Sequence, residues 1–73
     1  MQNRILSPDT AQLLRDEAAK LRSIADACRY NAEILTEMGQ IRRADYEAGD
    51  AIKHDDRARA YEAAAAQIES ELA

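Results

Sequence analysis

Alanine returns at every seventh residue along two stretches of this chain, and the two stretches do not share a register. The first series is Ala11, Ala18, Ala25 and Ala32, and the second is Ala44, Ala51, Ala58 and Ala65. Such a repeat is typical of helices that pack along a seam, and alanine lets their backbones approach closely. The sequence therefore predicts two packed helices and disfavours one continuous helix.

The ends of the two helices are marked by local signals. Ser7 can cap a helix, Pro8 suits the first helical position, and Asp9 favours the positive end of the helix dipole. Gly39 is the natural left-handed stop. We therefore expect one domain over residues 1 to 73. It has a lead-in of six residues, a first helix at about 8 to 38, a turn near Gly39, a second helix at about 41 to 72, and a candidate break at Gly49.

A fold-back at Gly39 makes the two series complementary. Leu21 falls opposite Ala58 and Leu14 opposite Ala65, which is the large-against-small layering that a close antiparallel pair needs. The predicted hairpin seam consists of Ala11, Leu14, Ala18, Leu21, Ala25, Cys28, Ala32, Leu35, Ala44, Ala51, His54, Ala58, Tyr61, Ala65, Ile68 and Leu72.

Charged residues beside the seam give an independent test of the antiparallel arrangement. The first helix carries Arg15, Arg22 and Arg29 at seven-residue intervals, and the second carries acids at the same intervals. Residues that flank an antiparallel seam pair in reverse order. The expected partners are Glu69 for Arg15, Glu62 for Arg22 and Asp55 for Arg29.

Several apolar residues lie outside the seam. A chain of 73 residues buries only a modest share of its own surface, and surplus apolar area usually marks a partner surface. We predict an all-α fold, an antiparallel Ala-rich coiled-coil hairpin that forms a homodimeric four-helix bundle. The residues predicted for self-association or for a partner are Leu13, Ile24, Ala27, Ile34, Met38, Ile41, Tyr46 and Ile52.

The sequence contains few residues in the arrangements that catalysis or metal binding requires. Glu47 and His54 are seven residues apart, whereas a metal pair on one helix needs a spacing of three or four. We therefore interpret His54 as a seam residue and Cys28 as a small buried hydrophobe. No glycine-rich phosphate loop, serine elbow or Cys-x-x-Cys motif occurs. We expect no enzyme, and no catalytic, metal or cofactor site.

Charge and hydropathy narrow the choice of partners. The net charge is −4, and no apolar run is long enough for a signal peptide or a membrane span. We predict a cytoplasmic protein without membrane contact, whose partners are itself and an unidentified protein. By analogy with the small acidic proteins of phages and plasmids, it would act as an adaptor or inhibitor. Binding would use the tip around Met38, Ile41 and Tyr46, or the flank of Leu13, Ile24 and Ile34.

Two other functions stay open. In length and expected topology the chain resembles Rop, a plasmid copy-number regulator in which a dimeric helical hairpin binds RNA. That resemblance implies an RNA- or DNA-binding regulator, with Arg42, Arg43, Arg57 and Arg59 as candidate nucleic-acid contacts. Nucleic acid is the less favoured partner, because acidic residues lie among these arginines. The third function is that of a structural subunit in a larger helical assembly.

Overall fold

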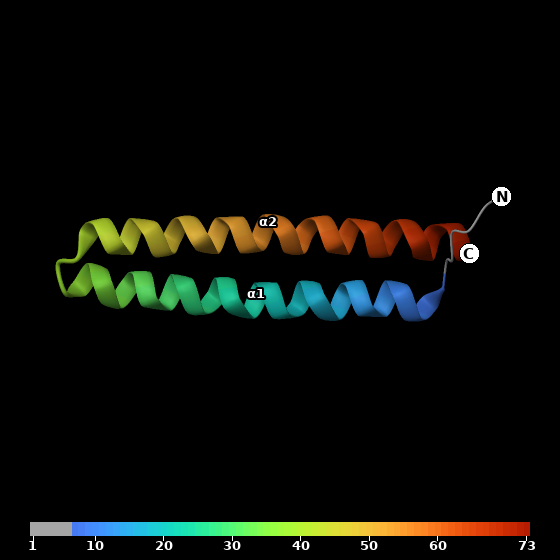
Figure 1. The fold of residues 1–73 in the computed structure, drawn as a ribbon, viewed down its shortest axis with the longest axis horizontal. Coiled ribbons are helices and arrows are strands. Elements are labelled where there is room, and N and C mark those ends of the chain that lie inside the picture. The colour runs from blue at the N-terminus through green and yellow to red at the C-terminus, as the bar shows by residue number, and fades with distance from the viewer. Residues whose placement is uncertain (1–6) are drawn as a thin grey trace.

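Two long helices make up the fold. The computed structural model describes residues 7 to 73, in which α1 (Pro8–Glu37) and α2 (Ile41–Leu72) lie side by side and run in opposite directions (Figure 1). The predicted all-helical hairpin is confirmed. The lead-in expected for the first six residues lies outside the described residues. α2 continues through Gly49, so the candidate break does not occur there.

The start of α1 is fixed by the predicted cap. The hydroxyl of Ser7 accepts a hydrogen bond from the backbone N–H of Thr10 at 3.2 Å, and Pro8 occupies the first helical position. The cap satisfies one of the backbone donors that a helix start leaves without an intrahelical partner. Local sequence is therefore sufficient to set where α1 begins.

Gly39 reverses the chain. Its φ of 79° is left-handed, its N–H bonds the carbonyl of Thr36 at 3.0 Å, and the N–H of Gln40 bonds that of Leu35 at 2.8 Å. These two bonds form the Schellman motif that commonly ends a helix at glycine. The left-handed stop predicted from the sequence is confirmed, and α2 follows after a single residue, Gln40.

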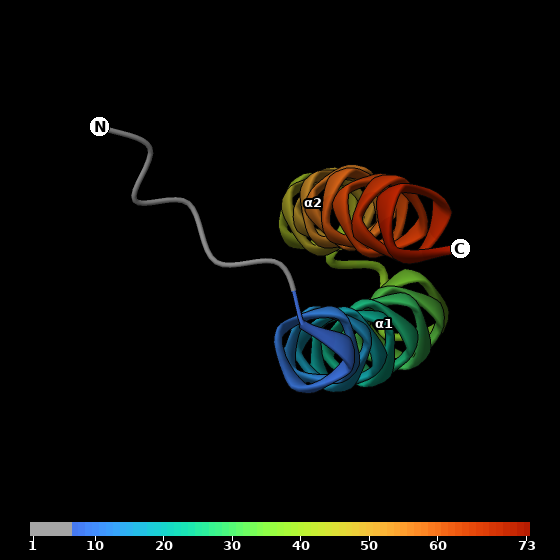
Figure 2. The ribbon, with the colours of Figure 1, turned by 90° about the vertical axis from the view of Figure 1, so that its right-hand side faces the viewer.

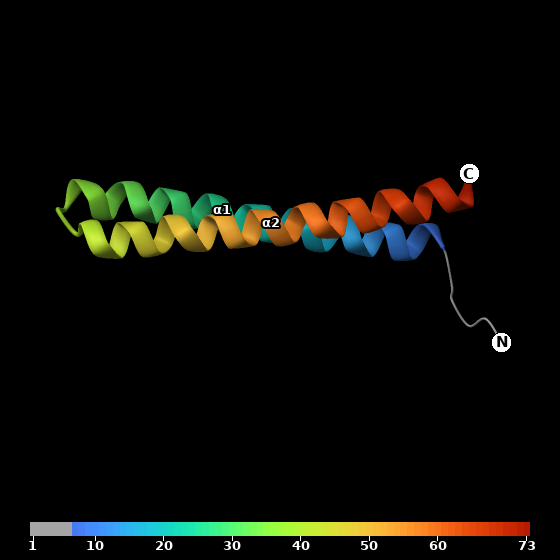
Figure 3. The same ribbon diagram turned by 90° about the horizontal axis from the view of Figure 1, so that it is seen from above.

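The core of the hairpin is made mainly of alanine. Leu21 is the one large residue in it, and it packs with Ala18, Ala58 and the half-buried Tyr61. The end-on view shows that each helix has one neighbour, and the view from above shows the helices crossing along their length (Figures 2 and 3). Each helix therefore buries one stripe and exposes the rest. The buried residues are Ala11, Ala18, Leu21, Ala25, Ala44, Ala51, Ala58 and Ala65.

The two glycines should respond oppositely to alanine substitution. A Cβ would meet nothing within 4 Å at either residue, so only backbone conformation differs between them. Gly39→Ala places a Cβ at positive φ and should lower the free energy of unfolding by about 1–2 kcal/mol. Gly49→Ala adds a better helix former within α2 and should raise it by about 0.5–1 kcal/mol. Urea unfolding measures both, and changes of the same sign would contradict the role given to Gly39.

Candidate protein-interaction surface

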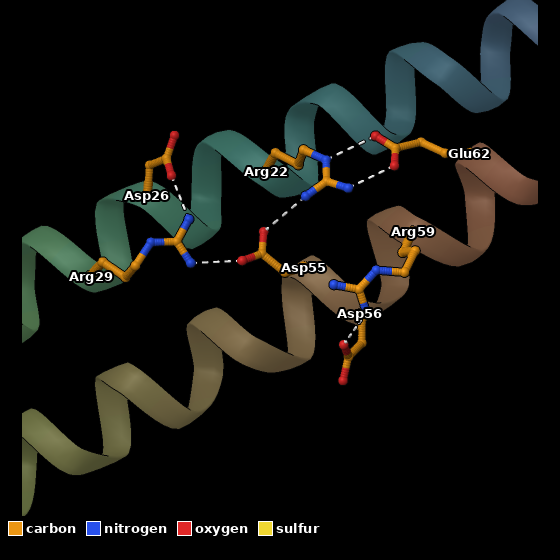
Figure 4. A network of polar contacts seen from close by, with 7 residues as sticks. All are labelled: Arg22, Asp26, Arg29, Asp55, Asp56, Arg59 and Glu62. Carbon is orange, nitrogen blue, oxygen red and sulfur yellow. Dashed lines mark hydrogen bonds and ion pairs between the residues drawn. The ribbon is translucent and has the colours of Figure 1, made fainter.

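One flank of the hairpin carries a ladder of ion pairs between the helices (Figure 4). Arg22 donates two hydrogen bonds to the carboxylate of Glu62, from Nε at 2.8 Å and from Nη2 at 2.6 Å. Asp55 lies between two arginines, 2.6 Å from Nη1 of Arg29 and 3.5 Å from Nη1 of Arg22. The ladder contains the three predicted pairs, Arg15 with Glu69, Arg22 with Glu62 and Arg29 with Asp55.

These contacts shift the acids in the ladder toward their charged form. The hydrogen bond from Arg22 lowers the pKa of Glu62 below its ordinary 4.5, and the bond from Arg29 lowers the pKa of Asp55 below 3.8. A carboxyl whose pKa is lower in the folded state adds stability above its unfolded pKa, and loses that contribution as the pH falls through the folded value. The side chains are partly exposed, so solvent screens each pair.

Acid should therefore weaken the hairpin through this ladder. Between roughly pH 5 and pH 3 the free energy of unfolding should fall, because the carboxylates become protonated and release their arginines. Glu62→Gln should show a smaller fall, whereas the exposed Glu37→Gln, which removes a carboxylate outside the ladder, should follow the wild type. Urea unfolding at a series of pH values measures this. Identical pH dependence in all three proteins would rule out the ladder as the source.

The opposite flank of α1 is apolar and exposed. Ile24, Ala27, Asn31, Ile34 and Met38 follow one another at intervals of three or four residues, so they form one stripe. Ile24 lies two residues after Arg22, about 200° around the helix, and therefore on the far side from the ladder. We call Leu13, Ile24, Ala27, Ile34 and Met38 the apolar flank. The exposed fractions of its four large residues are 68% for Leu13, 45% for Ile24, 38% for Ile34 and 65% for Met38.

A shallow depression of about 230 Å³ joins this flank to α2 near the turn. Ile34 and Leu35 contribute its apolar wall, and Asn31, Arg43 and Glu47 its polar lining. Nδ2 of Asn31 donates to Oε1 of Glu47 at 3.5 Å across the two helices. Arg43 therefore lies on the same side of the hairpin as the apolar flank, and so do the α2 residues at intervals of three or four from it. These are Tyr46, Asp50, Lys53 and Arg57.

Ile41 and Ile52 belong to the other side of the hairpin. Ile41 precedes Asp55 and Glu62 at multiples of seven, so it lies on the ladder flank, and Ile52 lies three residues before Asp55. Both are exposed, as is Ala48 between them. The residues predicted as one interface are therefore divided between two flanks. The predicted tip is divided as well, because Tyr46, which is 70% exposed, lies on the side of Met38 and away from Ile41.

The predicted seam residues lie between the helices. Leu14, Cys28, Leu35, His54 and Ile68 are half-buried. Ala32 and Tyr61 are half-buried too, and the remaining seam residues belong to the buried core, except Leu72. That residue is 44% exposed at the last position of α2.

Two observations near the seam bear on reactivity, the pKa of the Cys28 thiol and the placement of possible metal ligands. Burial, with Glu47 and Asp50 nearby, raises the pKa of the Cys28 thiol. A thiol of raised pKa is a weak nucleophile at neutral pH, because little thiolate is present. Within residues 7 to 73, no group of three or more His, Cys, Asp or Glu side chains is placed to hold a metal ion.

The cations of the described residues fall into two groups, those in ion pairs and those without one. In the part of the chain that is described, ion pairs engage Arg15, Lys20, Arg22, Arg29 and Arg59. Those left without an ion pair there are Arg42, Arg43, Lys53 and Arg57, all on α2. Of the candidate nucleic-acid contacts, Arg59 is thus 3.0 Å from Asp56, and the other three form no ion pair with any described residue.

Three residues of this surface are absent from the sequence-based site prediction. Asn31 and Glu47 line the depression, and Lys53 joins the row of unpaired cations. Asn31 could have been found from its spacing, since it lies seven residues from both Ile24 and Met38. The contact between Asn31 and Glu47 depends on how the two helices are rotated about the seam, which single-helix patterns do not give.

Comparisons with known proteins return no relative. Known protein families, curated proteins and solved structures were each searched, and none matches this chain. Neither helix described here is long and apolar enough to cross a membrane.

Proposed function

We propose that this hairpin is a non-catalytic protein-interaction module, an adaptor or an inhibitor, that binds another protein through the apolar flank of α1. The single observation that supports this function is the exposure of Leu13, Ile24, Ile34 and Met38 in one stripe. Exposed apolar stripes at helical spacing are the usual means by which a helix docks onto another helix or into a groove.

The environment of the stripe also supports this function. The ladder side engages its arginines and acids with each other, so that flank has fewer free groups to offer a partner. The apolar flank has Tyr46 and Arg43 beside it on α2, and Tyr and Arg are enriched where interfaces concentrate their binding energy. A depression at its tip end can seat one side chain of a partner.

The alternatives each have one observation in their favour. A homodimeric four-helix bundle, predicted from the sequence, is favoured by the small core, which holds a single large residue, Leu21. An RNA- or DNA-binding regulator is favoured by the unpaired Arg42, Arg43 and Arg57. The exposed Ile41 and Ile52 favour a subunit of a larger assembly that is contacted on both flanks.

Capture from cells tests the proposal with closely matched variants. Ile24→Asp plus Ile34→Asp removes the apolar flank, whereas Ile41→Asp plus Ile52→Asp makes the same change on the ladder flank. Tagged wild type and the second variant should retain a bound protein, and the first should lose it by tenfold or more. That loss corresponds to about 1.4 kcal/mol or more of binding free energy. Circular dichroism confirms folding, and equal capture by both variants would eliminate the apolar flank.

A further inference from the structure

We infer that the partner site is a two-helix surface specific for an acidic amphipathic helix of another protein. The apolar flank of α1 would take the apolar stripe of that helix, and Arg43, Lys53 and Arg57 of α2 would take its carboxylates. We call these three cations the basic border. This inference rests on the proposed function and adds the chemistry of the partner to it.

The apolar flank has the length and spacing of a helix-binding seam. From Leu13 to Met38 it extends roughly 37 Å along α1. Its residues recur at intervals of three, four or multiples of seven, which a second helix can match residue for residue. Two charged residues interrupt the stripe, Glu17 and Lys20, and they lie 3.9 Å apart in an ion pair of their own. The stripe itself therefore presents no unbalanced charge.

The basic border supplies the charge preference. Arg43, Lys53 and Arg57 lie on the same side of α2 as the depression, and they form no ion pair within residues 7 to 73. Asp50 is the one acid in this row and Glu47 lines the depression with Arg43, so three cations stand against two acids here. The protein as a whole has a net charge of −4, so this row reverses the sign of the molecule locally. A helix with carboxylates along one edge of its apolar stripe would gain three opposite charges there.

A second copy of the chain complements this surface less well. A two-fold interface uses the same patch on both copies, so each copy brings the same basic border to the contact. Repulsion between like charges weakens such a pairing. A nucleic acid would use the basic border and leave Leu13, Ile24 and Ile34 in water. The acidic helix uses both halves of the surface, the apolar stripe and the cations.

Two synthetic helices separate these outcomes. Both peptides carry the same leucine stripe over about four heptads. One has glutamate along both edges of the stripe and the other has lysine. Fluorescence anisotropy with the full chain should give at least about tenfold tighter binding of the glutamate peptide, and the preference should shrink as salt rises.

Variants assign the preference to named residues. Arg43→Glu plus Arg57→Glu should reverse the preference, so that the lysine peptide binds more tightly. Ile34→Asp should weaken the binding of both peptides by tenfold or more. Arg42→Glu is the matched control, because Arg42 is also unpaired but lies outside the border. It should leave the preference within about twofold of wild type, given the weak effect of a distant exposed charge.

Several outcomes of these experiments would overturn the inference. Equal binding of the two peptides, or binding of neither, overturns the acidic-helix specificity. A sedimentation dimer that Ile34→Asp dissociates shows that a second copy occupies the surface, and an RNA complex lost in Arg43→Glu shows a nucleic-acid site; both overturn the inference. If the peptides fail but capture from cells still depends on Ile24 and Ile34, the partner chemistry is wrong and the interaction module stands.

Discussion

The close approach of the two helices is the constraint on which the rest of this structure depends. Ala58 is fully buried in a cluster with Leu21 and Ala18, so at this layer α2 contributes only a methyl group and its backbone lies close to α1. The same proximity brings Arg22 within 2.8 Å of Glu62 on the neighbouring helix. A seam of larger residues would hold the helices further apart. The hydrogen bonds between Arg22 and Glu62 would then lengthen or break, because the distance between two helix axes depends on the side chains at their contact.

An alanine seam also determines what stays exposed. Alanine offers little apolar area, so the hairpin core contains a single large buried residue, Leu21. Leu14 and Leu35 are half-buried on the seam, whereas Leu13 and Met38 on the apolar flank are about two-thirds exposed. The two flanks differ in their chemistry. One carries the ion-pair ladder beside the exposed Ile41 and Ile52, and the other combines exposed apolar residues with α2 cations that form no ion pair within residues 7 to 73. The proposed interaction function rests on this asymmetry.

Much of the fold could be predicted from sequence because its determinants are local or strictly periodic. The cap at Ser7, the turn at Gly39 and the pairing of Arg22 with Glu62 each follow from spacing alone. The division of the exposed apolar residues between the two flanks was harder to predict from the sequence. Met38 and Ile41 are near each other in sequence, but the chain reverses between them at Gly39, so the period of one helix does not give the flank on which the other residue lies. The surface proposed for a partner is built by both helices together, so the pattern of either helix alone does not give it.

Leu21 fills the space opposite the small side chain of Ala58, and a double-mutant cycle measures the coupling between these two residues directly. Leu21→Ala removes the large side chain and Ala58→Leu adds one opposite, in an osmolyte that keeps all four proteins folded. Alone, each should lower the free energy of unfolding, by about 2–5 and about 1–3 kcal/mol respectively. Together they should cost at least about 1 kcal/mol less than the sum, whereas Leu21→Ala with the distant Ala44→Leu should be additive. Additivity within about 0.5 kcal/mol for Leu21 and Ala58 would contradict the complementary seam.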